Sequence, residues 1–329
     1  MSRPLLALTM GDPSGIGPEV LVRAVPGAPA RCVALGDPAI LAEAAARFAP
    51  ELRVVLRETP EDVSGEQGLL EVLATGALGE ELAAGEVRAA SGEAACGAVI
   101  AGIDLALAGR VQGIVTAPFH KGALAAAGHS WPGHTELLAE RAGAERVAMM
   151  MVGDRLRVVL ATIHCPLAEV SGRLSIESEL DALRFADAGA RAFGIERPRV
   201  AVAGLNPHAG EGGHFGREEI EVLGPAVQQA LAEGLDVAGP LAGDTVFLAA
   251  REGEFDVVVA QYHDQGLIPV KLEGLDRGVN VTLGLPFVRT SPDHGTAFDR
   301  AWQGTANPGS MRRAIEVAAQ LANSRSVGP

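Results

Sequence analysis

The sequence predicts an α/β protein built as two α/β/α lobes with largely parallel sheets. Strand-like and helix-like segments alternate along the whole chain, which is the pattern of βαβ units. The composition agrees, because 48% of the residues are hydrophobic but only 4% are aromatic, and small apolar side chains suit close helix–sheet contacts. A chain of 329 residues exceeds one ordinary core, so we expect two lobes.

The expected elements follow in chain order. A strand over 5–10 leads into a glycine-bearing turn, and a strand over 31–35 leads into a helix that ends near Arg47. Residues 59–90 are rich in Glu and Gly with weak patterning, which predicts a surface excursion. Further segments are a helix over 92–108, strands over 113–116 and 279–283, strands beginning at Val158, Val200 and Val257, and helices near 136–142, 176–193, 218–233 and 308–322.

The first turn, Gly11–Gly17, has two interpretations. Its position between a strand and a helix start could hold an anion. Its glycine spacing is not that of a Rossmann fingerprint, so it is equally well a tight structural turn.

Charge and cysteine usage limit the partners and the compartment. The net charge of −14 argues against nucleic acid or an anionic membrane surface, since either requires a basic face. We expect no membrane span and no signal peptide, because the apolar runs are short and Met1–Pro4 leads straight into a strand. The odd set Cys32, Cys96 and Cys165 indicates a reducing cytoplasm. For Cys165 we favour a buried structural thiol over a metal ligand.

Three histidines, His164, His208 and His263, each stand just past a short run of β-forming residues that breaks into a turn. The carboxyl ends of parallel strands face the crevice in which α/β proteins bind ligands. Three imidazoles from three such ends can meet at a divalent metal ion that keeps one position open for substrate. Alternatively, each histidine hydrogen-bonds its own turn, but the threefold repeat favours the metal site.

Other polar side chains are candidates for binding and catalysis. His134 and Thr135 lie at a helix start, where they can bind a substrate oxygen or phosphate, although Thr135 can equally be a helix cap. Asp244 is a candidate base or amine partner, or the cap of the helix that begins there.

A third group of polar residues brackets the strand expected over 279–283. Lys271, Asn280 and Arg289 lie outside evident helices and can form a pocket for an anionic substrate, unless they make ordinary surface salt bridges.

Two short segments near the carboxyl terminus resemble the nucleotide-binding loop of the isocitrate and isopropylmalate dehydrogenases. They are the His-Gly-Thr-Ala run within 293–299 and the Ala-Asn-Pro that follows at 306–308. In that family these segments surround the adenine end of NAD. The resemblance therefore implies cofactor contacts at His294, Gly295, Thr296, Ala297 and Asn307. No arginine cluster marks a 2′-phosphate site, which favours NAD, with NADP as the alternative.

Motifs spread from end to end of the chain resemble those of the 4-hydroxythreonine-4-phosphate dehydrogenase family of vitamin B6 synthesis. They are MGDPSGIGPE from Met10, TAPFHKGAL from Thr116, PGHTE from Pro132, GLNPHAGEGGHFGREE from Gly204, GPLAGDT from Gly239, YHDQGLIPVKL from Tyr262 and GVNVTLGLPFVRTSPDHGTA from Gly278. Residues 59–90 and the extreme carboxyl terminus match poorly.

The resemblance implies a fold like that of isocitrate and isopropylmalate dehydrogenase. Residues 1–125 with 285–329 would form a discontinuous first lobe, and 126–284 a second lobe with the metal-ligand histidines and the dimer contacts. The implied protein is a homodimer with its active site in the interdomain cleft at the subunit interface, and with His263 supplied by the partner subunit. Substrate contacts carry over to His134, Thr135, Lys271, Asn280 and Arg289, and we expect Asp244 and Lys271 to be catalytic.

The implied reaction is the NAD-dependent oxidation of 4-phosphooxy-L-threonine to 2-amino-3-oxo-4-phosphooxybutanoate. Loss of carbon dioxide then gives 3-amino-2-oxopropyl phosphate, for pyridoxal phosphate synthesis. Three neutral imidazoles suit Zn²⁺, with Co²⁺ or Mn²⁺ as substitutes and Mg²⁺ the least suited. Alternatives are a family member that oxidises D-threonate or D-erythronate 4-phosphate, a metal-dependent hydrolase, and a sugar-phosphate-binding protein without catalysis.

Overall fold

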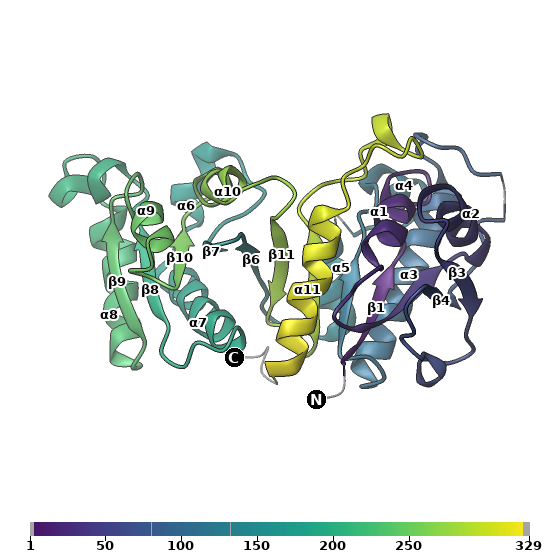
Figure 1. Cartoon of the computed structure of the whole chain (residues 1–329). Coiled ribbons are helices and arrows are strands. Elements are labelled where there is room, and N and C mark those ends of the chain that lie inside the picture. Colours follow the sequence, from purple (N-terminus) through teal and green to yellow (C-terminus); the bar gives the residue numbers. More distant parts are fainter. Residues whose placement is uncertain (1–2, 80, 132, 325–329) are drawn as a thin grey trace. The chain divides into compact units, whose positions relative to one another are not determined.

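The computed structural model describes residues 3–79, 81–131 and 133–324, which form two compact units (Figure 1). Unit 1 holds the described residues up to Glu145 together with Leu285–Asn323, and unit 2 holds Arg146–Gly284 and Ser324. The first lobe was predicted to end at residue 125, which is too early, because the helix over 134–142 packs against the helix over 89–107 of unit 1. Pro132 of the PGHTE motif and residues 325–329 lie outside the described residues.

Unit 1 contains a sheet with the strand order β3-β4-β2-β1-β5-β12, in which every described pair is parallel. Its strands are β1 (Leu5–Thr9), β2 (Arg31–Gly36), β3 (Arg53–Leu56), β4 (Leu69–Ala74), β5 (Gly113–Thr116) and β12 (Val288–Pro292). Every residue of β1, β5 and β12 is buried, as expected for parallel strands covered on both faces. The predicted α/β class is confirmed.

The helices of unit 1 pack on this sheet and on one another. They are α1 (Gly17–Ala24), α2 (Pro38–Phe48), α3 (Ala89–Leu107), α4 (Lys121–Ala126), α5 (His134–Ala142) and α11 (Gly309–Ser324), with short 3₁₀ turns η1 (Pro60–Asp62) and η5 (Phe298–Arg300). Helix α1 packs against α2, and α3 packs against α4, α5 and three strands. Helix α2 follows β2 as the sequence predicts, and Asp37 caps it by accepting hydrogen bonds from the Ala39 and Ile40 amides.

Helix α3 departs from the expectation that no segment could span a membrane. It is long and apolar enough to cross a membrane, by length and composition alone. Half of its apolar 18-residue stretch is buried inside the protein, and the helix contacts β1, β2 and β5. Its many alanines, with valine, isoleucine and leucine, make the helix apolar, and small side chains suit close packing on the sheet.

Residues 59–90 are not simply a surface excursion, because they contain the internal strand β4. This strand lies between β2 and β3. The sequence signal is weakened by Glu71, which is buried. Its carboxylate accepts hydrogen bonds from Arg57 and from the Ser64 and Gly65 amides, so a charged residue is tolerated inside the strand.

Unit 2 contains a mixed sheet with the strand order β11-β6-β7-β10-β8-β9. Strands β7, β10, β8 and β9 are parallel, while β6 runs antiparallel to both β7 and β11. The strands are β6 (Ala148–Val152), β7 (Arg157–Leu160), β8 (Arg199–Ala203), β9 (Asp236–Leu241), β10 (Val257–Ala260) and β11 (Val279–Leu283).

Helices cover both faces of the central strands of unit 2. They are α6 (Val170–Arg173), α7 (Ile176–Ala192), α8 (Gly224–Ala232), α9 (Val246–Arg251) and α10 (His263–Leu272), with shorter turns η2 (Leu167–Glu169), η3 (Pro207–Gly213) and η4 (Glu219–Leu223). Val258 and Ala260 share a hydrophobic cluster with residues of α9 and α10. Side chains alternate between the two faces of a strand, so Val257 and Val259 point to the opposite face. Helix α7, which also contacts β10, covers that face.

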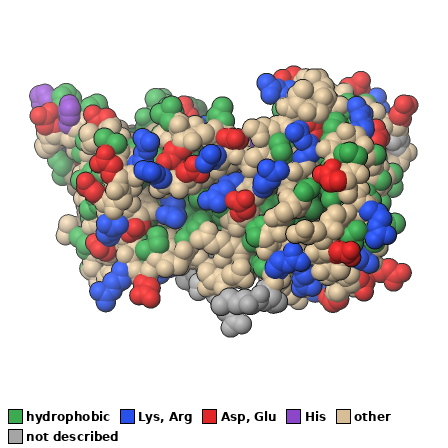
Figure 2. All heavy atoms as spheres, in the orientation of Figure 1, with side chains coloured by type: hydrophobic (Ala, Val, Ile, Leu, Met, Phe, Trp, Pro, Cys, Tyr) green, Lys and Arg blue, Asp and Glu red, His purple; other side chains and the backbone are tan. Residues whose placement is uncertain are grey.

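Acidic and basic side chains are intermingled on the face shown in Figure 2, and no extended basic surface covers that face. This distribution agrees with the net charge of −14.

Candidate functional site

The three predicted metal ligands follow three neighbouring strands of unit 2. His164 follows β7, His208 follows β8 and His263 is the first residue of α10, directly after β10. Because β10 lies between β7 and β8 and is parallel to both, the three turns meet at one edge of the sheet. Figure 2 shows histidine side chains exposed near η3, the turn that carries His208.

His164 and His263 lie side by side in the single chain. Their ring centroids are 5.7 Å apart and their planes are inclined by 41°. Two imidazoles on one tetrahedral zinc ion would have centroids about 5 Å apart, so this pair fits a shared ion. Asp264 Oδ1 is 2.7 Å from His263 Nδ1, an orientation that leaves His263 Nε2 as the ligand nitrogen.

His208 is not brought into this pair. Among the described residues, no group of three or more His, Cys, Asp or Glu side chains is placed to hold a metal ion. His208 and Asp244 line a cavity of about 670 Å³, whereas His164 and His263 line another of about 460 Å³. Tyr262 and Asp264 border both cavities, so the two spaces adjoin.

The turn that carries His208 is strained. Five consecutive residues, from His208 to Gly212, have left-handed φ values between 43° and 77°, and His208, Ala209 and Glu211 are not glycine. Each such residue costs about 1–2 kcal/mol. Strain of this kind persists where surrounding contacts enforce it, commonly at ligand sites.

Hydrogen bonds from Asn206 hold this strained turn in place. The Asn206 amide donates to Glu219 Oε1 at 2.7 Å, and its side-chain nitrogen donates to Glu219 Oε2 at 3.0 Å and to Glu218 Oε2 at 2.8 Å. Glu219 is buried and begins the π-turn η4. The predicted helix over 218–233 therefore begins with a single irregular turn before α8.

Cys165 differs from its prediction. Its thiol is free and partly exposed, and the residue lines the cavity of His164 and His263. The residues that follow β7 line this cavity. The thiol therefore does not pack in the core, where the sequence predicted it.

Two of the expected substrate contacts meet in unit 1. Arg289 is buried, and its Nη2 donates to Thr116 Oγ1 at 2.7 Å. The His134 ring stacks on Phe119 with centroids 3.5 Å apart. Burial, and secondarily the Arg289 charge, hold the pKa of His134 well below its ordinary value. Burial also lowers the pKa of Arg289 to about 10, so at neutral pH a neutral imidazole faces a cationic guanidinium.

The start of α5 shows whether Thr135 is a helix cap. Gly133 is the N-cap of α5, and Thr135 lies inside the helix, so Thr135 is not the cap. The His134 Nε2 atom is buried and lacks a hydrogen-bond partner among the described residues. An unsatisfied buried nitrogen of this kind suits a bound polar group.

The remaining candidates lie in unit 2. Asp244 is exposed and is not a helix cap, since Thr245 is the N-cap of α9. Lys271 was expected outside a helix but lies in the last turn of α10. Asn280 lies in β11. The Asn280 Oδ1 atom is buried and has no partner within the described part of the chain.

The predicted nucleotide segments border the turn before α1. The Thr296 carbonyl accepts a hydrogen bond from the Ile16 amide at 3.0 Å, and Ala297 has a left-handed φ of 41°. His294 Nε2 is buried without a partner among the residues described, and burial lowers its pKa. Orphaned polar atoms on such a loop fit a bound group.

The second nucleotide segment borders α1 itself. Glu19, which is buried, accepts hydrogen bonds from the amides of Gly304 and Ala306 at 3.1 and 2.9 Å. Asn307 Oδ1 accepts from the Gly309 amide at 2.8 Å, at the start of α11. Asn307 therefore has a local structural role besides any contact with a cofactor.

Sequence reasoning gave no role to several buried polar residues near these sites. Asp12 is fully buried in the first turn, and burial raises its pKa to about 6. Gln261 and Glu179 are also fully buried, and burial raises the pKa of Glu179 to about 7. The available signal was a polar residue directly after an apolar strand, as Gln261 follows Val257–Ala260.

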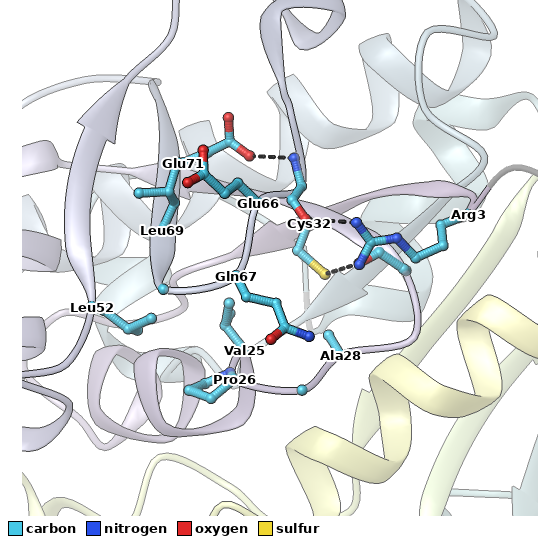
Figure 3. Close-up of a pocket in the computed structure, with 14 residues that line it drawn as sticks. Arg3, Val25, Pro26, Ala28, Cys32, Leu52, Glu66, Gln67, Leu69 and Glu71 are labelled. Carbon is cyan, nitrogen blue, oxygen red and sulfur yellow. Dashed lines mark hydrogen bonds between the residues drawn. The ribbon is translucent and has the colours of Figure 1, made fainter.

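A further cavity in unit 1 is too small for a substrate (Figure 3). It encloses about 40 Å³ between the turn at 25–28 and the segment 65–69, space for about one water molecule. Two of its charged side chains are engaged: Arg3 donates to the Gly65 carbonyl at 2.7 Å, and Glu71 accepts from the Gly65 amide at 2.7 Å.

Comparison with known proteins identifies the family. The family model described as pyridoxal phosphate biosynthetic protein PdxA matches residues 28–318. The chain belongs to the PdxA family. A 4-hydroxythreonine-4-phosphate dehydrogenase of Beijerinckia indica is 54% identical over 318 residues, which cover 96% of this chain and 94% of that protein. The predicted family is confirmed.

Two further PdxA relatives are similar over nearly their full lengths. A D-threonate 4-phosphate dehydrogenase of Salmonella typhimurium is 46% identical, over 98% of this chain and 100% of that protein. The crystal structure of a 4-hydroxythreonine-4-phosphate dehydrogenase from Klebsiella pneumoniae has a TM-score of 0.91 at 42% identity, over 97% of this chain and 98% of that one. This PdxA chain is thus an oxidoreductase, and the hydrolase and non-catalytic alternatives are wrong.

Proposed function

We propose that this chain is an NAD-dependent, metal-dependent dehydrogenase of 4-phosphooxy-L-threonine. Its product would be 2-amino-3-oxo-4-phosphooxybutanoate, which loses carbon dioxide to give 3-amino-2-oxopropyl phosphate. The observation that carries the proposal is the pair of imidazoles, His164 and His263, at the ligand-binding edge of a parallel sheet in a PdxA chain. The nucleotide is NAD, with NADP as the alternative, and the proposed setting is the cytoplasm, which suits three free cysteines.

The proposed metal ligands are His164, His208 and His263, and Zn²⁺ suits three neutral imidazoles best. When bound, the ion would supply Lewis acidity that lowers the pKa of a substrate alcohol. The resemblance implied that the partner subunit supplies His263. The pairing of His164 with His263 in one chain instead favours His208 as the ring supplied across an interface.

The substrate groups would be divided between cationic and neutral donors. Arg289 is held by Thr116, so its guanidinium presents a fixed geometry to a phosphate or carboxylate. Lys271 and Asn280 would contribute a further charge and an amide. His134 is neutral at physiological pH because its pKa is lowered, so it can hydrogen-bond a substrate oxygen without adding charge.

Asp244 is the proposed proton acceptor or amine partner. It is exposed in the cavity that also holds His208 and has no capping role in α9. A carboxylate in this position can take the alcohol proton as hydride leaves the substrate carbon for the nicotinamide.

The proposed homodimer is supported by an apolar surface on unit 2. Ile268 and Leu272 on α10, Leu248 on α9 and Leu275 beyond α10 are 58%, 83%, 54% and 72% exposed. Large exposed apolar side chains that gather on one surface mark interaction sites, and Ile268 and Leu272 are one helical turn apart on α10. Ile268 and Leu272 also line the cavity of His208, so a second copy on this surface would reach the site.

Oxidation of D-threonate 4-phosphate is the second candidate function. The Salmonella typhimurium relative of that name is 46% identical to this chain. That substrate would carry a hydroxyl where the first candidate carries an amine, so a metal–alcohol site serves both.

The deciding experiment is a substrate comparison with the purified protein. Reduced-nucleotide absorbance would be followed with 4-phosphooxy-L-threonine and D-threonate 4-phosphate, with NAD or NADP, before and after removal and return of Zn²⁺. We expect NADH formation from 4-phosphooxy-L-threonine that disappears with chelation and returns with metal. Turnover of D-threonate 4-phosphate alone would select the second candidate, and full activity without metal would reject the metal site.

A further inference from the structure

We propose that Gln261 is a positioning residue that fixes the spacing of the three histidine-bearing turns. It would act through the backbone and would not touch substrate. The inference rests on the proposed metal site. It concerns how one chain holds its own three ligand turns, which in the proposed dimer would serve two sites, His164 and His263 in one and His208 in the other.

The Gln261 side chain links the ends of two structural elements to β10. The residue is fully buried directly after β10 and two positions before His263. Its Nε2 donates to the Ala203 carbonyl at the end of β8, at 3.0 Å. The same nitrogen donates to Glu179 Oε1 of α7, at 3.2 Å.

The main chain of Gln261 completes the connection. Its carbonyl accepts a hydrogen bond from Thr162 Oγ1 at 2.7 Å, in the turn that leads to His164. Its amide donates to Gln265 Oε1 at 2.7 Å, and Gln265 Nε2 donates to the Gly204 carbonyl at 2.7 Å. The residue is therefore bonded, directly or through Gln265, to the turns after β7 and β8.

These contacts constrain all three ligand turns at once. The bonded residues Thr162, Gly204 and Gln261 each lie within four positions of a predicted ligand in the chain. Buried hydrogen bonds are shielded from water and hold one geometry. Metal sites require ligands placed within a few tenths of an ångström, which surrounding residues must enforce.

A simpler role is also open to Gln261: it could only satisfy buried polar groups and add stability. If Gln261 only adds stability, loosening the other end of β8 and β10 should weaken metal binding as much as loosening Gln261. If Gln261 positions the ligands, only its own replacement should weaken metal binding. Asp256 provides that comparison, because at the start of β10 it accepts hydrogen bonds from the Arg199 amide at 2.8 Å and from Arg199 Nε at 3.0 Å, at the start of β8.

The test is Co²⁺ and Zn²⁺ titration of metal-free Gln261→Met and Asp256→Ala proteins, with melting temperature measured in parallel. Met keeps the side-chain length but removes the amide. We expect Gln261→Met to bind about 10- to 100-fold more weakly, with an altered Co²⁺ visible spectrum. Asp256→Ala should keep wild-type affinity and spectrum although its melting temperature falls.

Wild-type affinity in Gln261→Met, or an equal loss in Asp256→Ala, would overturn the inference. If Gln261→Met does not fold, Thr162→Val is the second test. It changes the side-chain shape little and removes only the hydrogen bond from Thr162 to the Gln261 carbonyl. It should bind metal several-fold more weakly, and unchanged binding would refute the positioning role. Failure of the wild-type protein to bind either metal would refute the proposed function itself.

Discussion

Individual buried side chains in this protein are ionised or neutral according to their surroundings. Arg289 stays cationic although it is buried, because even its lowered pKa of about 10 lies above neutrality. His134 beside it is held neutral by burial and by that charge. Asp12 carries an unfavourable charge at neutral pH, since burial raises its pKa to about 6. The same property, burial, therefore sets three different charge states.

Replacing Asp12 with Asn should stabilise the protein at high pH. The folded carboxyl has a pKa of about 6 against an ordinary 3.8, so between these values the folded state binds a proton that the unfolded state lacks. Above pH 6 the charged form destabilises folding by about 3 kcal/mol. We expect Asp12→Asn to raise the free energy of unfolding by about that amount at pH 8 and by about half as much at pH 5.

Denaturant unfolding at both pH values measures this effect, with the exposed residue change Asp276→Asn as the control. A loss of stability in Asp12→Asn that is the same at pH 5 and pH 8 would contradict the prediction.

Replacing Arg289 with Lys should weaken substrate binding. Lysine cannot reproduce the fork that bonds Thr116 while presenting further donors to an anion. We expect kcat/KM to fall about 100-fold, mainly through a higher KM. Thr116→Val should give a smaller rise in KM, and Arg53→Lys, on the exposed edge strand β3, should give none. Unchanged KM in Arg289→Lys would remove this residue from the substrate site.

At the scale of elements, sequence patterns succeeded where local signals decide the structure. Strands β5 and β11 have the predicted bounds, because short apolar runs flanked by turn residues have few alternatives. The rule that parallel strand ends share an edge placed the turns of His164, His208 and His263 on the same side of the sheet, but it did not predict that only His164 and His263 would be paired within one chain. Strand β4 was not predicted because it contains the charged residue Glu71. The hydrogen bond from Arg57 that stabilises this buried carboxylate is a tertiary contact, which no local sequence pattern records.

The left-handed run at 208–212 was also outside sequence reasoning. The segment is rich in glycine, but Ala209 and Glu211 are not residues that favour positive φ. Their conformation depends on Asn206 and its two glutamate acceptors, which is a tertiary effect. The sequence could therefore locate this functional loop but not its backbone geometry.

Replacing Ala209 with Gly should stabilise the protein. Ala209 has a φ of 51°, and glycine adopts that conformation without the clash of a Cβ atom, so the free energy of unfolding should rise by about 1 kcal/mol. The matched control Ala46→Gly, at an exposed position inside α2, should lower it by about 1 kcal/mol. Urea unfolding of both variants measures the difference, and two losses of equal size would show that the turn is not strained.

At the scale of the whole molecule, the proposed metal site would require a second copy of the chain. One described chain pairs two imidazoles and leaves His208 in the adjoining cavity. The apolar surface of α9 and α10 borders that cavity. Association and catalysis should therefore be lost together when this surface is made polar.

Replacing Leu272 with Asp tests that link. The side chain is 83% exposed in the single chain, so the change should not disturb the fold of unit 2. A charge buried at the centre of an interface is costly, and we expect the dimer to dissociate at least about 10-fold more readily by sedimentation, with a parallel loss of metal binding. The control Leu56→Asp, at an exposed position of β3, should change neither dimer dissociation nor metal binding. A fully dimeric Leu272→Asp protein would place the interface elsewhere.

Mixing inactive variants can identify which ring crosses the interface. If His164 and His263 come from one copy and His208 from the other, a dimer of His164→Ala with His208→Ala keeps one intact site. Random exchange in a two-fold dimer would then restore about a quarter of wild-type activity and metal content. His164→Ala mixed with His263→Ala would restore nothing, because both changes fall on the same side of every site. Recovery in the second mixture and not in the first would instead assign His263 to the partner, and recovery in neither would place all three ligands in a single chain.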